Sequence, residues 1–394
     1  MAVPMRSRGS GAPEETATPM RSRVIGALRG LVGSTGAVAV ALLLGAVIIV
    51  LSGDDPRDAY RALFDGAFGD RRSVAESLVL ATPLIFGGLA FAIAARAGLF
   101  NIGIEGQFFL GSLAAGLVGA IDLGLPLVAH LPLALLAGIA AGAIWGWLPG
   151  ALKARTGASE VITTIMLNYI AFQISSFVLR QDATLAVNPD FSTTDPVEAT
   201  AELPLLLDRT RLHAGILMAV VAAMILWYLL FRTTFGYRIR TVGLSRGASA
   251  YAGIPWGRTI ALAMLVSGLL GGLGGAVNTL GLAGRHYSQP AGYGFTAIAV
   301  GLVGRNHPLG IVLAGLLFGA LNAGSTRMQA QAGTSRELVL ILQGLVILSV
   351  AAFAAVGRIR RDTRPTANIR PGADRAATVG TEPAIEPRPG TPAL

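Results

Sequence analysis

The stretch LVLATPLIFGGLAFAIAARA at residues 78–97 contains one charged residue, Arg96, in twenty positions. A helix of this length crosses the ~30 Å hydrocarbon core of a bilayer. Comparable runs recur along the 394-residue chain. We place apolar spans at residues 33–52, 78–97, 99–121, 126–151, 160–180, 213–231, 259–282, 291–304, 309–326 and 337–356. The sequence therefore predicts an all-α, polytopic membrane protein with about ten transmembrane helices. The eighth span is short for a full crossing. It is therefore tilted, re-entrant or wrongly bounded, and these three alternatives remain open.

The composition excludes several classes of protein. Apolar residues make up 53% of the chain and charged residues 13%, whereas a soluble domain carries about 25% charged residues. An ordinary soluble enzyme is therefore excluded. The chain has no cysteine, and its four histidines are scattered. We therefore expect no thiol chemistry, no catalytic residue and no metal site.

The placement of basic residues predicts the orientation, because cytoplasmic segments of membrane proteins are rich in Lys and Arg. With ten spans, 21 of the 31 basic residues fall on the side of the N-terminus. Acidic residues gather in the opposite segments at 54–76 and 181–212, which are expected to be external loops. Both termini are thus expected in the cytoplasm. Because the basic residues lie between the apolar spans and at the ends of the chain, the net charge of +9 does not indicate a nucleic-acid partner.

The two ends of the chain differ from the rest in composition. Residues 1–30 are rich in Arg, Ser, Gly and Pro and are expected to form a disordered basic cytoplasmic tail. Residues 358–394 form a second, Pro- and Arg-rich tail, which leaves 31–357 as the transmembrane domain. A secretory signal peptide is the alternative for the first apolar run, but a run of about 20 residues favours an uncleaved anchor.

The sequence GLFNIGIEGQ at residues 98–107 places Asn101, Glu105 and Gln107 within the third span. A carboxylate inside a bilayer is costly, by about 2.5–3.5 kcal/mol on insertion scales. On a helix, Asn101 and Glu105 would share a face. Two interpretations remain open: these side chains line a solute pathway, or they join helices and lie near the wetted end of the span.

The fifth span opens with EVITTIMLNY at residues 160–169. Glu160, Thr164 and Asn168 recur every four residues and form one polar stripe on the expected helix. Ser159 is expected to cap that helix and Glu160 to complement its dipole, which is a structural role. Asn168 and the adjacent Tyr169 are the better pathway candidates.

The segment FGYRIRTVGLSRGASAYAGIP at residues 235–255 is the longest internal cytoplasmic segment. We expect a short amphipathic helix at about 245–252, bounded by Gly243 on one side and by Gly253 and Pro255 on the other. Such a helix fits a groove on a partner protein, although helical turns are also common in cytoplasmic loops.

The seventh span contains regularly spaced glycines. The spacing of Gly268 with Gly272 and of Gly271 with Gly275 predicts close helix packing, and Asn278 beyond them is a candidate pathway residue.

The sequence contains no P-loop for nucleotide binding. Lys153 is the only lysine, and no P-loop surrounds it. Any coupling to ATP by a P-loop must therefore come from another subunit.

Together these segments resemble the permease subunits of bacterial ABC importers, in the branch that holds the ribose and branched-chain amino acid permeases. The similarity is greatest to the nucleoside, or simple-sugar-type, permeases. It rests on residues 98–107 and 160–169, on YAGI at 251–254 and on GFTAIAVGL at 294–302. Ribose-type relatives usually have an Asp-Leu-Ser pattern where this chain has NIGIE at 101–105.

The resemblance implies an alternating-access permease in the bacterial cell membrane, with nucleosides as cargo. It implies that segment 236–256 carries the coupling helix, with contact residues Leu244, Ser245, Ala248, Tyr251, Ala252 and Gly253. It also implies a second permease, which makes a heterodimer, a cytoplasmic ATPase that holds ATP and Mg²⁺, and an extracytoplasmic binding lipoprotein. For a nucleoside, the expected pathway residues are Asn101, Glu105, Gln107, Asn168, Tyr169 and Asn278.

Three alternatives remain. A simple sugar or a branched-chain amino acid would suit the same importer class. A stand-alone secondary transporter that uses Glu105 as an ion relay would also place a carboxylate in the membrane. A membrane scaffold is disfavoured, because scaffolding does not need polar stripes inside the bilayer.

Overall fold

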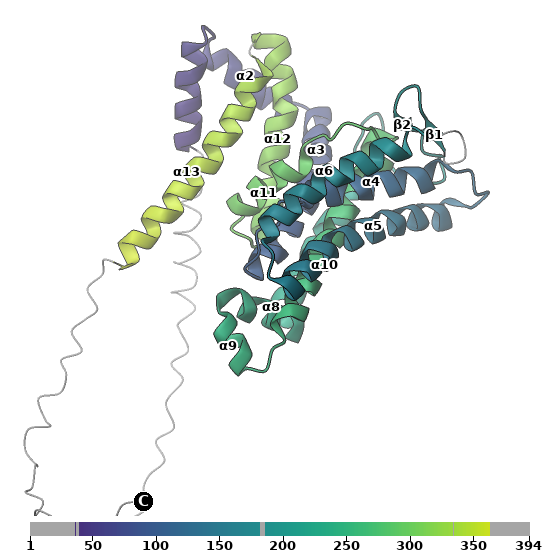
Figure 1. The fold of residues 1–394 in the computed structure, drawn as a ribbon. Helices are drawn as coiled ribbons and strands as arrows, with labels where there is room; N and C mark the ends of the chain where they lie inside the picture. The colour runs from purple at the N-terminus through teal and green to yellow at the C-terminus, as the bar shows by residue number, and fades with distance from the viewer. Residues whose placement is uncertain (1–35, 37–38, 182–185, 334, 363–394) are drawn as a thin grey trace, which may run out of the picture.

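The computed structural model describes residues 36, 39–181, 186–333 and 335–362 of the chain. This part is a bundle of helices with one small β-hairpin (Figure 1). The helices are Ala39–Leu51, α2 (Pro56–Phe68), α3 (Arg71–Arg96), α4 (Ile104–Ala120), α5 (Leu127–Thr156), α6 (Glu160–Val178), α7 (Gly215–Arg232), α8 (Thr234–Leu244), α9 (Arg246–Tyr251), α10 (Trp256–Asn278), the π-helix η1 (Thr279–Ala283), α11 (Tyr293–Val303), α12 (Pro308–Ala332) and α13 (Arg336–Asp362). The hairpin pairs β1 (Val187–Asn188) with β2 (Thr193–Thr194).

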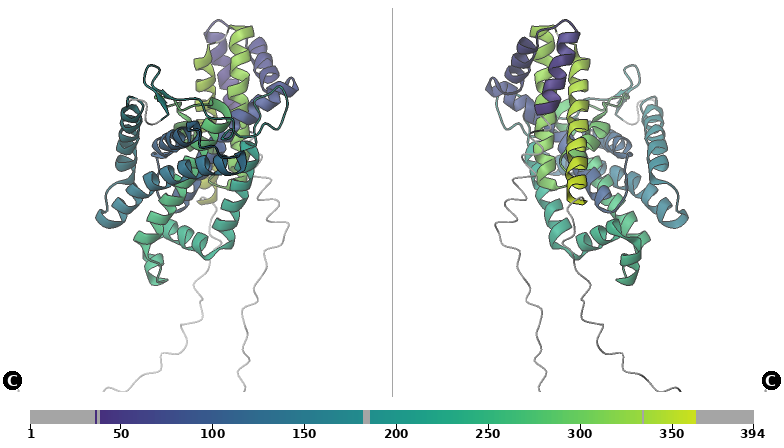
Figure 2. Two further views of the ribbon diagram at one scale, coloured as in Figure 1. Left: turned by 90° about the vertical axis from the view of Figure 1, so that its right-hand side faces the viewer. Right: turned by 90° about the vertical axis from the view of Figure 1, so that its left-hand side faces the viewer.

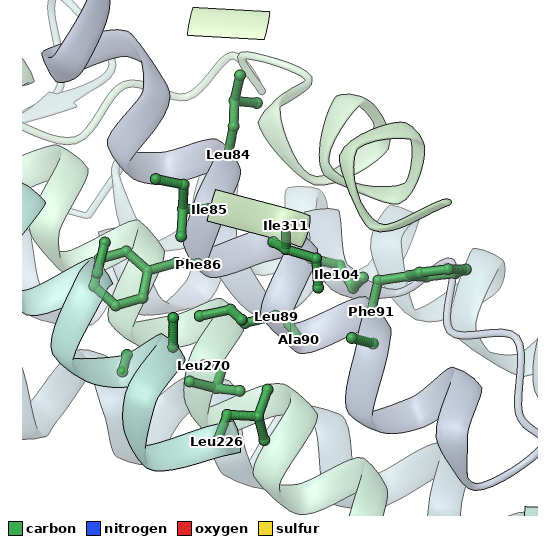
Figure 3. Close-up of a cluster of buried hydrophobic side chains, with 14 of the residues drawn as sticks. Leu84, Ile85, Phe86, Leu89, Ala90, Phe91, Ile104, Leu226, Leu270 and Ile311 are labelled. Carbon is green, nitrogen blue, oxygen red and sulfur yellow. The ribbon is translucent and has the colours of Figure 1, made fainter. Parts of the chain in front are cut away.

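Helix α3 forms the centre of the bundle. Its residues from Ala81 to Ala94 are all buried, and α7, α10, α11 and α12 pack around it. Figure 3 shows Phe86, Leu89 and Phe91 of α3 among side chains from the surrounding helices. Gly87 lets α11 approach, because an added Cβ atom would collide with the Cβ of Ala297. The run that predicted a membrane span is thus buried in protein rather than exposed to lipid.

Helix α10 has two glycine faces, as its spacing predicted. Gly268 and Gly272 face α5, whose glycines follow the same four-residue period: a Cβ atom on Gly142 would lie 2.5 Å from the Cα of Gly272. A Cβ atom on Gly146 would lie 2.6 Å from the Cα of Gly268. Gly271 and Gly275 face α4 instead. The two backbones of α5 and α10 therefore touch directly, which side chains on either helix would prevent.

Within the part of the chain that the structure describes, six helices are long and apolar enough to cross a membrane: α3, α5, α6, α7, α10 with η1, and α12. Shorter apolar helices lie at Ala39–Leu51, α4, α11 and Glu337–Ser349. Each expected span therefore contains an apolar helix within the described residues. The predicted tails lie outside them, apart from residues 358–362 at the end of α13.

The segment 54–76, expected as an external loop, is instead α2 and the first turns of α3. Asp55 caps α2 by accepting a hydrogen bond from the amide of Arg57 at 2.8 Å, and Pro56 occupies the first turn. Ala59, Ala62 and Leu63 are buried in a core shared with α12 and the helix Ala39–Leu51. The acidic residues are on a helix with one apolar face, so their charge alone was a poor guide to a loop.

The segment 186–213 lies across the C-terminal end of α4 and across η1. Its backbone amides at Glu198 and Leu203 donate to the carbonyls of Gly119 and Leu280, at 2.8 and 2.9 Å. The amide of Val197 donates to the carbonyl of Gly284 at 2.8 Å. Helices α8 and α9 project from the opposite end of the bundle (Figure 2). The structure thus has a covered end and an end that presents α9.

Candidate functional site

Helix α4 begins inside the bundle rather than at its end. The third span was predicted to be helical from residue 99, but residues 97–103 are not helical, and α4 starts at Ile104. Ile104 packs beside Gly87, nine residues from the end of α3 at Arg96. Nine helical residues span ~13 Å. The chain therefore turns back along α3 for about that distance before α4 begins.

Asn101 and Gln107 meet in this turn, both almost fully buried. The Asn101 side-chain amide donates to Ser267 Oγ at 2.9 Å and to Gln107 Oε1 at 3.2 Å. Its Oδ1 accepts from the amide of Gly103 at 2.9 Å. Ser267 Oγ in turn donates to the Ala90 carbonyl at 2.6 Å. This network joins α3, α4 and α10. It also gives a hydrogen-bond partner to a backbone amide of the non-helical turn, which in a helix would bond to another backbone group.

Glu105 holds the start of α11. Its carboxylate accepts hydrogen bonds from the backbone amides of Gly292, Gly294 and Phe295 at 2.9, 2.6 and 3.3 Å. These are donors that the first turn of a helix leaves without intrahelical partners. The side chain is 1% exposed, so water does not take its place. A carboxylate also complements the positive end of the α11 dipole.

Asn168 on α6 supports the same turn from the other side. Its Oδ1 accepts from the amide of Gly106 at 2.8 Å, and its Nδ2 donates to the Ile102 carbonyl at 3.0 Å. Tyr169, the next residue, faces away and is 63% exposed. Asn168 therefore belongs with Asn101 and Glu105, whereas Tyr169 does not.

Two details at the start of these helices differ from the prediction. Asn101 lies before α4, so it does not share a helical face with Glu105. Ser159 makes no capping hydrogen bond through its side chain. Glu160 lies in the first turn of α6, as expected, and also pairs with Lys153 in the last turn of α5. The contacts of Asn101, Glu105, Gln107 and Asn168 match the helix-joining interpretation, and a pathway role for them stays a prediction.

Asn278 is distant from this turn, at the end of α10. It lies eleven residues beyond Ser267, ~16 Å along the helix. Its Oδ1 is buried and has no hydrogen-bond partner among the described residues. The π-helix η1 follows directly, and such wide turns often occur at functional sites.

A second polar cluster beside η1 was not found from the sequence. His286 is 2% exposed; its Nδ1 lies 2.8 Å from Ser112 Oγ on α4, and its Nε2 lies 2.8 Å from Ser175 Oγ on α6. Ser112 also bonds Thr279 of η1 at 2.5 Å. A signal for Ser175 existed, because it extends the buried stripe of Thr164 and Asn168 toward the end of α6. His286 lies in a loop and carried no such signal.

This cluster predicts a pH dependence of stability. Burial lowers the pKa of His286 to about 3, whereas an exposed histidine has a pKa of ~6.5. Between these values the unfolded chain binds the extra proton, so stability falls as the pH falls below ~6.5. At pH 5 the low pKa of His286 should lower the free energy of unfolding by about 2 kcal/mol relative to its value above pH 7.

We expect the variant His286→Gln to show a shallower fall of melting temperature between pH 7.5 and pH 5 than the unchanged chain. Two other histidines are present in both proteins and contribute to the remaining slope: His213, whose burial lowers its pKa to about 4, and His307, whose pKa is lowered by burial and by Arg96. Equal slopes in the two proteins would show that His286 titrates normally.

Helix α9 lies where the coupling helix was expected. Ser245 Oγ accepts from the amide of Ala248 at 3.2 Å, and Gly253, with φ +67°, follows the end of the helix. Tyr251 is 98% exposed. The predicted contact residues Leu244, Ser245, Ala248, Tyr251, Ala252 and Gly253 are all exposed. Helix α8, which the sequence did not predict, precedes α9 and buries Ile239 and Val242.

Residues 73–351 match the family described as "Branched-chain amino acid transport system / permease component". The chain belongs to this permease family. The guanosine ABC transporter permease protein NupP of Bacillus subtilis is 40% identical over 81% of this permease and 92% of its own length.

Two other relatives are nearly as similar. The nucleoside ABC transporter permease protein NupB of Lactococcus lactis is 38% identical over 80% of this permease and 89% of its own length. The glucose ABC transporter permease protein TsgB13 of Haloferax volcanii is 38% identical over 79% and 84%. No solved structure matches the permease significantly. With its apolar helices, the permease is a multi-pass protein of the cell membrane.

Proposed function

We propose that this chain is the membrane subunit of an ATP-driven importer whose cargo is a nucleoside. The observation that carries the proposal is the 40% identity to a guanosine permease, which extends over 92% of that protein. A nucleoside permease at 38% identity supports the same cargo class. Membership in a family of ABC permeases favours this role over a stand-alone secondary transporter.

A simple sugar is the second candidate cargo, because a glucose permease is also 38% identical. Uptake in cells that carry the whole transporter separates the two. We expect labelled guanosine to accumulate, and excess unlabelled nucleoside, but not excess glucose, to block it. Accumulation of glucose that nucleosides do not inhibit would overturn the nucleoside assignment.

We propose that ten helices enter the membrane and that both termini lie in the cytoplasm. The ten apolar helices of the described residues support this count, and the basic residues on α8, α9 and the end of α3 support the orientation. In this arrangement α11 is a half-length helix whose start lies at membrane depth beside Glu105. Discontinuous helices of this kind are common in transporters.

The proposed partners are a second permease, a cytoplasmic ATPase that holds ATP and Mg²⁺, and an extracytoplasmic binding lipoprotein. The exposure of α6 supports the proposal of a second permease, because this helix buries only Thr164, Asn168, Ala171 and Ser175. Met166, Tyr169 and Phe177 on its other faces are exposed. Some of this apolar surface contacts lipid, and the rest is available to a second permease in a heterodimer.

We propose that Tyr169 and Asn278 line the pathway. Tyr169 is exposed, and the buried Oδ1 of Asn278 has no partner in the described structure. The role proposed for the other four candidates is to hold the turn before α4 and the start of α11 in place; these are Asn101, Glu105, Gln107 and Asn168. A nucleoside offers hydroxyl and base edges that an amide and a phenol can bind.

Transport is proposed to proceed by alternating access, driven through α9. Two of the contacts between the α8–α9 segment and the bundle involve α3 and α10. Gly243 at the end of α8 lies against the backbone of Arg96, so an added Cβ would collide with the Arg96 carbonyl. Arg246 stacks over the ring of Trp256 at 4.2 Å, at the start of α10. Movement of α9 by the ATPase would thus reach α3 and α10.

Replacing Tyr251 with aspartate should abolish ATP-stimulated uptake while the chain still inserts into the membrane. The side chain is almost fully exposed, so its loss removes little from the fold. A charge in an apolar docking groove is costly. Uptake and membrane insertion are measured for this variant and for Tyr251→Phe, which keeps the ring and should transport normally. Unchanged uptake by the aspartate variant would rule out docking at this position.

A further inference from the structure

Three nitrogen-bearing side chains meet around the ring of Phe231, at the end of the bundle that carries α8. The guanidinium carbons of Arg96 and Arg240 lie 5.4 and 5.3 Å from the centre of this ring. The His307 ring lies 5.4 Å from it, tilted by 31°. These residues come from α3, α7, α8 and the turn before α12. We call Arg96, Phe231, Arg240 and His307 the Phe231 cluster.

No acidic side chain pairs with the Phe231 cluster among the described residues. The ion pairs in this part of the chain are Lys153–Glu160, Arg211–Glu76 and Arg327–Asp70. Arg96 Nε donates to the Asn306 carbonyl at 3.0 Å, and Arg240 Nε donates to the Gly236 carbonyl at 3.4 Å. These acceptors are neutral, so both positive charges remain uncompensated.

The effect of this charge is visible at His307. Burial and the positive charge of Arg96 both lower the pKa of His307. Three basic groups therefore share a partly desolvated site, where like charges repel more strongly than in water. Arg305 and Asn306, in the turn that meets Arg96, both have left-handed φ angles, of 56° and 53°. The site is thus built with two unfavourable features, repulsion and strained backbone.

Neighbouring arginines at the same end of the bundle differ. Arg232 stacks on Trp227 at 5.6 Å, and Arg246 stacks on Trp256 at 4.2 Å. Both are exposed, and each has a ring to itself. The general excess of basic residues in cytoplasmic segments accounts for them. It does not account for two half-buried guanidinium groups that converge on one ring.

We propose that the Phe231 cluster binds the phosphate group of an anionic phospholipid in the cytoplasmic leaflet. Guanidinium groups bind phosphate oxygens through paired N–H donors, and an anion between Arg96 and Arg240 would relieve their repulsion. Arg96 is the last residue of α3, and Phe231 is next to last in α7, so both lie at the level of lipid headgroups. Basic pockets between transmembrane helices on this side bind such headgroups.

The surrounding surface favours a lipid over a soluble anion. Ile225 and Tyr228 on α7 are each 60% exposed, and lie within two helical turns of Phe231. Leu309 and Leu313 at the start of α12 are 58% and 62% exposed. These apolar side chains extend from the cluster toward the membrane interior, where acyl chains lie. Because Arg240 is on α8, a bound lipid would also touch the element that positions α9.

The test measures lipid binding to the full-length chain purified in detergent. Native mass spectrometry follows titration with phosphatidylglycerol or, as the zwitterionic comparison, phosphatidylcholine. We expect the unchanged chain to prefer phosphatidylglycerol. Arg96→Gln and Arg240→Gln should each weaken phosphatidylglycerol binding about fivefold, the contribution of one basic residue near an anionic surface. The matched control Arg232→Gln, at the same end of the bundle, should bind as the unchanged chain does.

Other outcomes would overturn the proposal. Equal loss in all three variants, or no loss in any, would show that the cluster is not a specific site. Competition by millimolar inorganic phosphate, together with no preference between the two lipids, would assign the site to a soluble anion. If Arg96→Gln and Arg240→Gln lost the ATPase subunit but kept lipid binding, the site would belong to an acidic protein surface. Should Arg96→Gln fail to fold, Arg240→Gln on the shorter helix α8 decides the result.

Discussion

Replacing Glu105 with alanine is expected to abolish uptake and to prevent most of the protein from folding. The change removes the acceptor of three backbone amides: that of Gly294, which is buried, and those of Gly292 and Phe295, which are partly buried. A buried donor without a partner costs about 1–3 kcal/mol, so the loss at Gly294 alone is a sizeable fraction of the stability of a domain, and the two partly buried amides add to it. Fluorescence-detected gel filtration measures the folded fraction, and labelled nucleoside measures uptake.

Glutamine separates the capping role of Glu105 from a loss of shape. Glu105→Gln keeps one acceptor oxygen but directs an amide group toward a backbone donor, so we expect an intermediate loss. The matched control is Glu160→Gln, which breaks a partly exposed pair with Lys153. Such pairs contribute about 0–1 kcal/mol. A larger loss of uptake for Glu160→Gln than for Glu105→Gln would contradict the role assigned to Glu105.

Replacing Gly272 with leucine should remove nearly all correctly folded protein from the membrane. A Cβ atom at this position would lie 2.9 Å from the Cα of Gly142 and closer still to the Gly138 carbonyl. The obstacle is backbone, so no rotamer change in α5 relieves it. Even one added methyl group in a packed core costs about 1–3 kcal/mol, and leucine adds three more carbon atoms. The folded fraction after detergent extraction is the measurement.

Gly344 provides the matched control for the glycine interface. It also lies in a helix, α13, but an added Cβ there would meet nothing within 4 Å. Gly344→Ala should therefore fold normally, and Gly272→Ala should show a partial loss. Normal folding of Gly272→Leu would mean that α5 and α10 do not pack as closely as described.

The sequence was sufficient for the helical membrane fold and for α9. Both depend on local signals: apolar runs for the helices, and Ser245, Gly253 and Pro255 for the short helix. It failed at residues 97–103, because hydropathy cannot distinguish an apolar helix from an apolar turn buried in protein. It also failed at α2, where Asp55 and Pro56 were present as a start signal but the acidic residues were taken as a loop.

The sequence identified several residues of the candidate site but not the contacts that they make. Asn101, Glu105 and Asn168 were identified because polar side chains inside a membrane are energetically costly and are therefore expected to have a role. Their partners could not be predicted, because Glu105 bonds Gly292 and Gly294, almost 190 residues away. The Ser112–His286–Ser175 cluster was missed for the same reason. Each of its members lies on a different segment, and only the fold brings them together.

The segment 186–213 has a consequence for leakage. It is tied by main-chain hydrogen bonds to the end of α4 at Gly119, to η1 at Leu280 and to Gly284, which follows the end of η1. The end of α4 and η1 cannot separate unless these bonds break or the segment deforms. We therefore expect this side of the bundle to stay closed to ion leakage while the opposite end, which presents α9, moves.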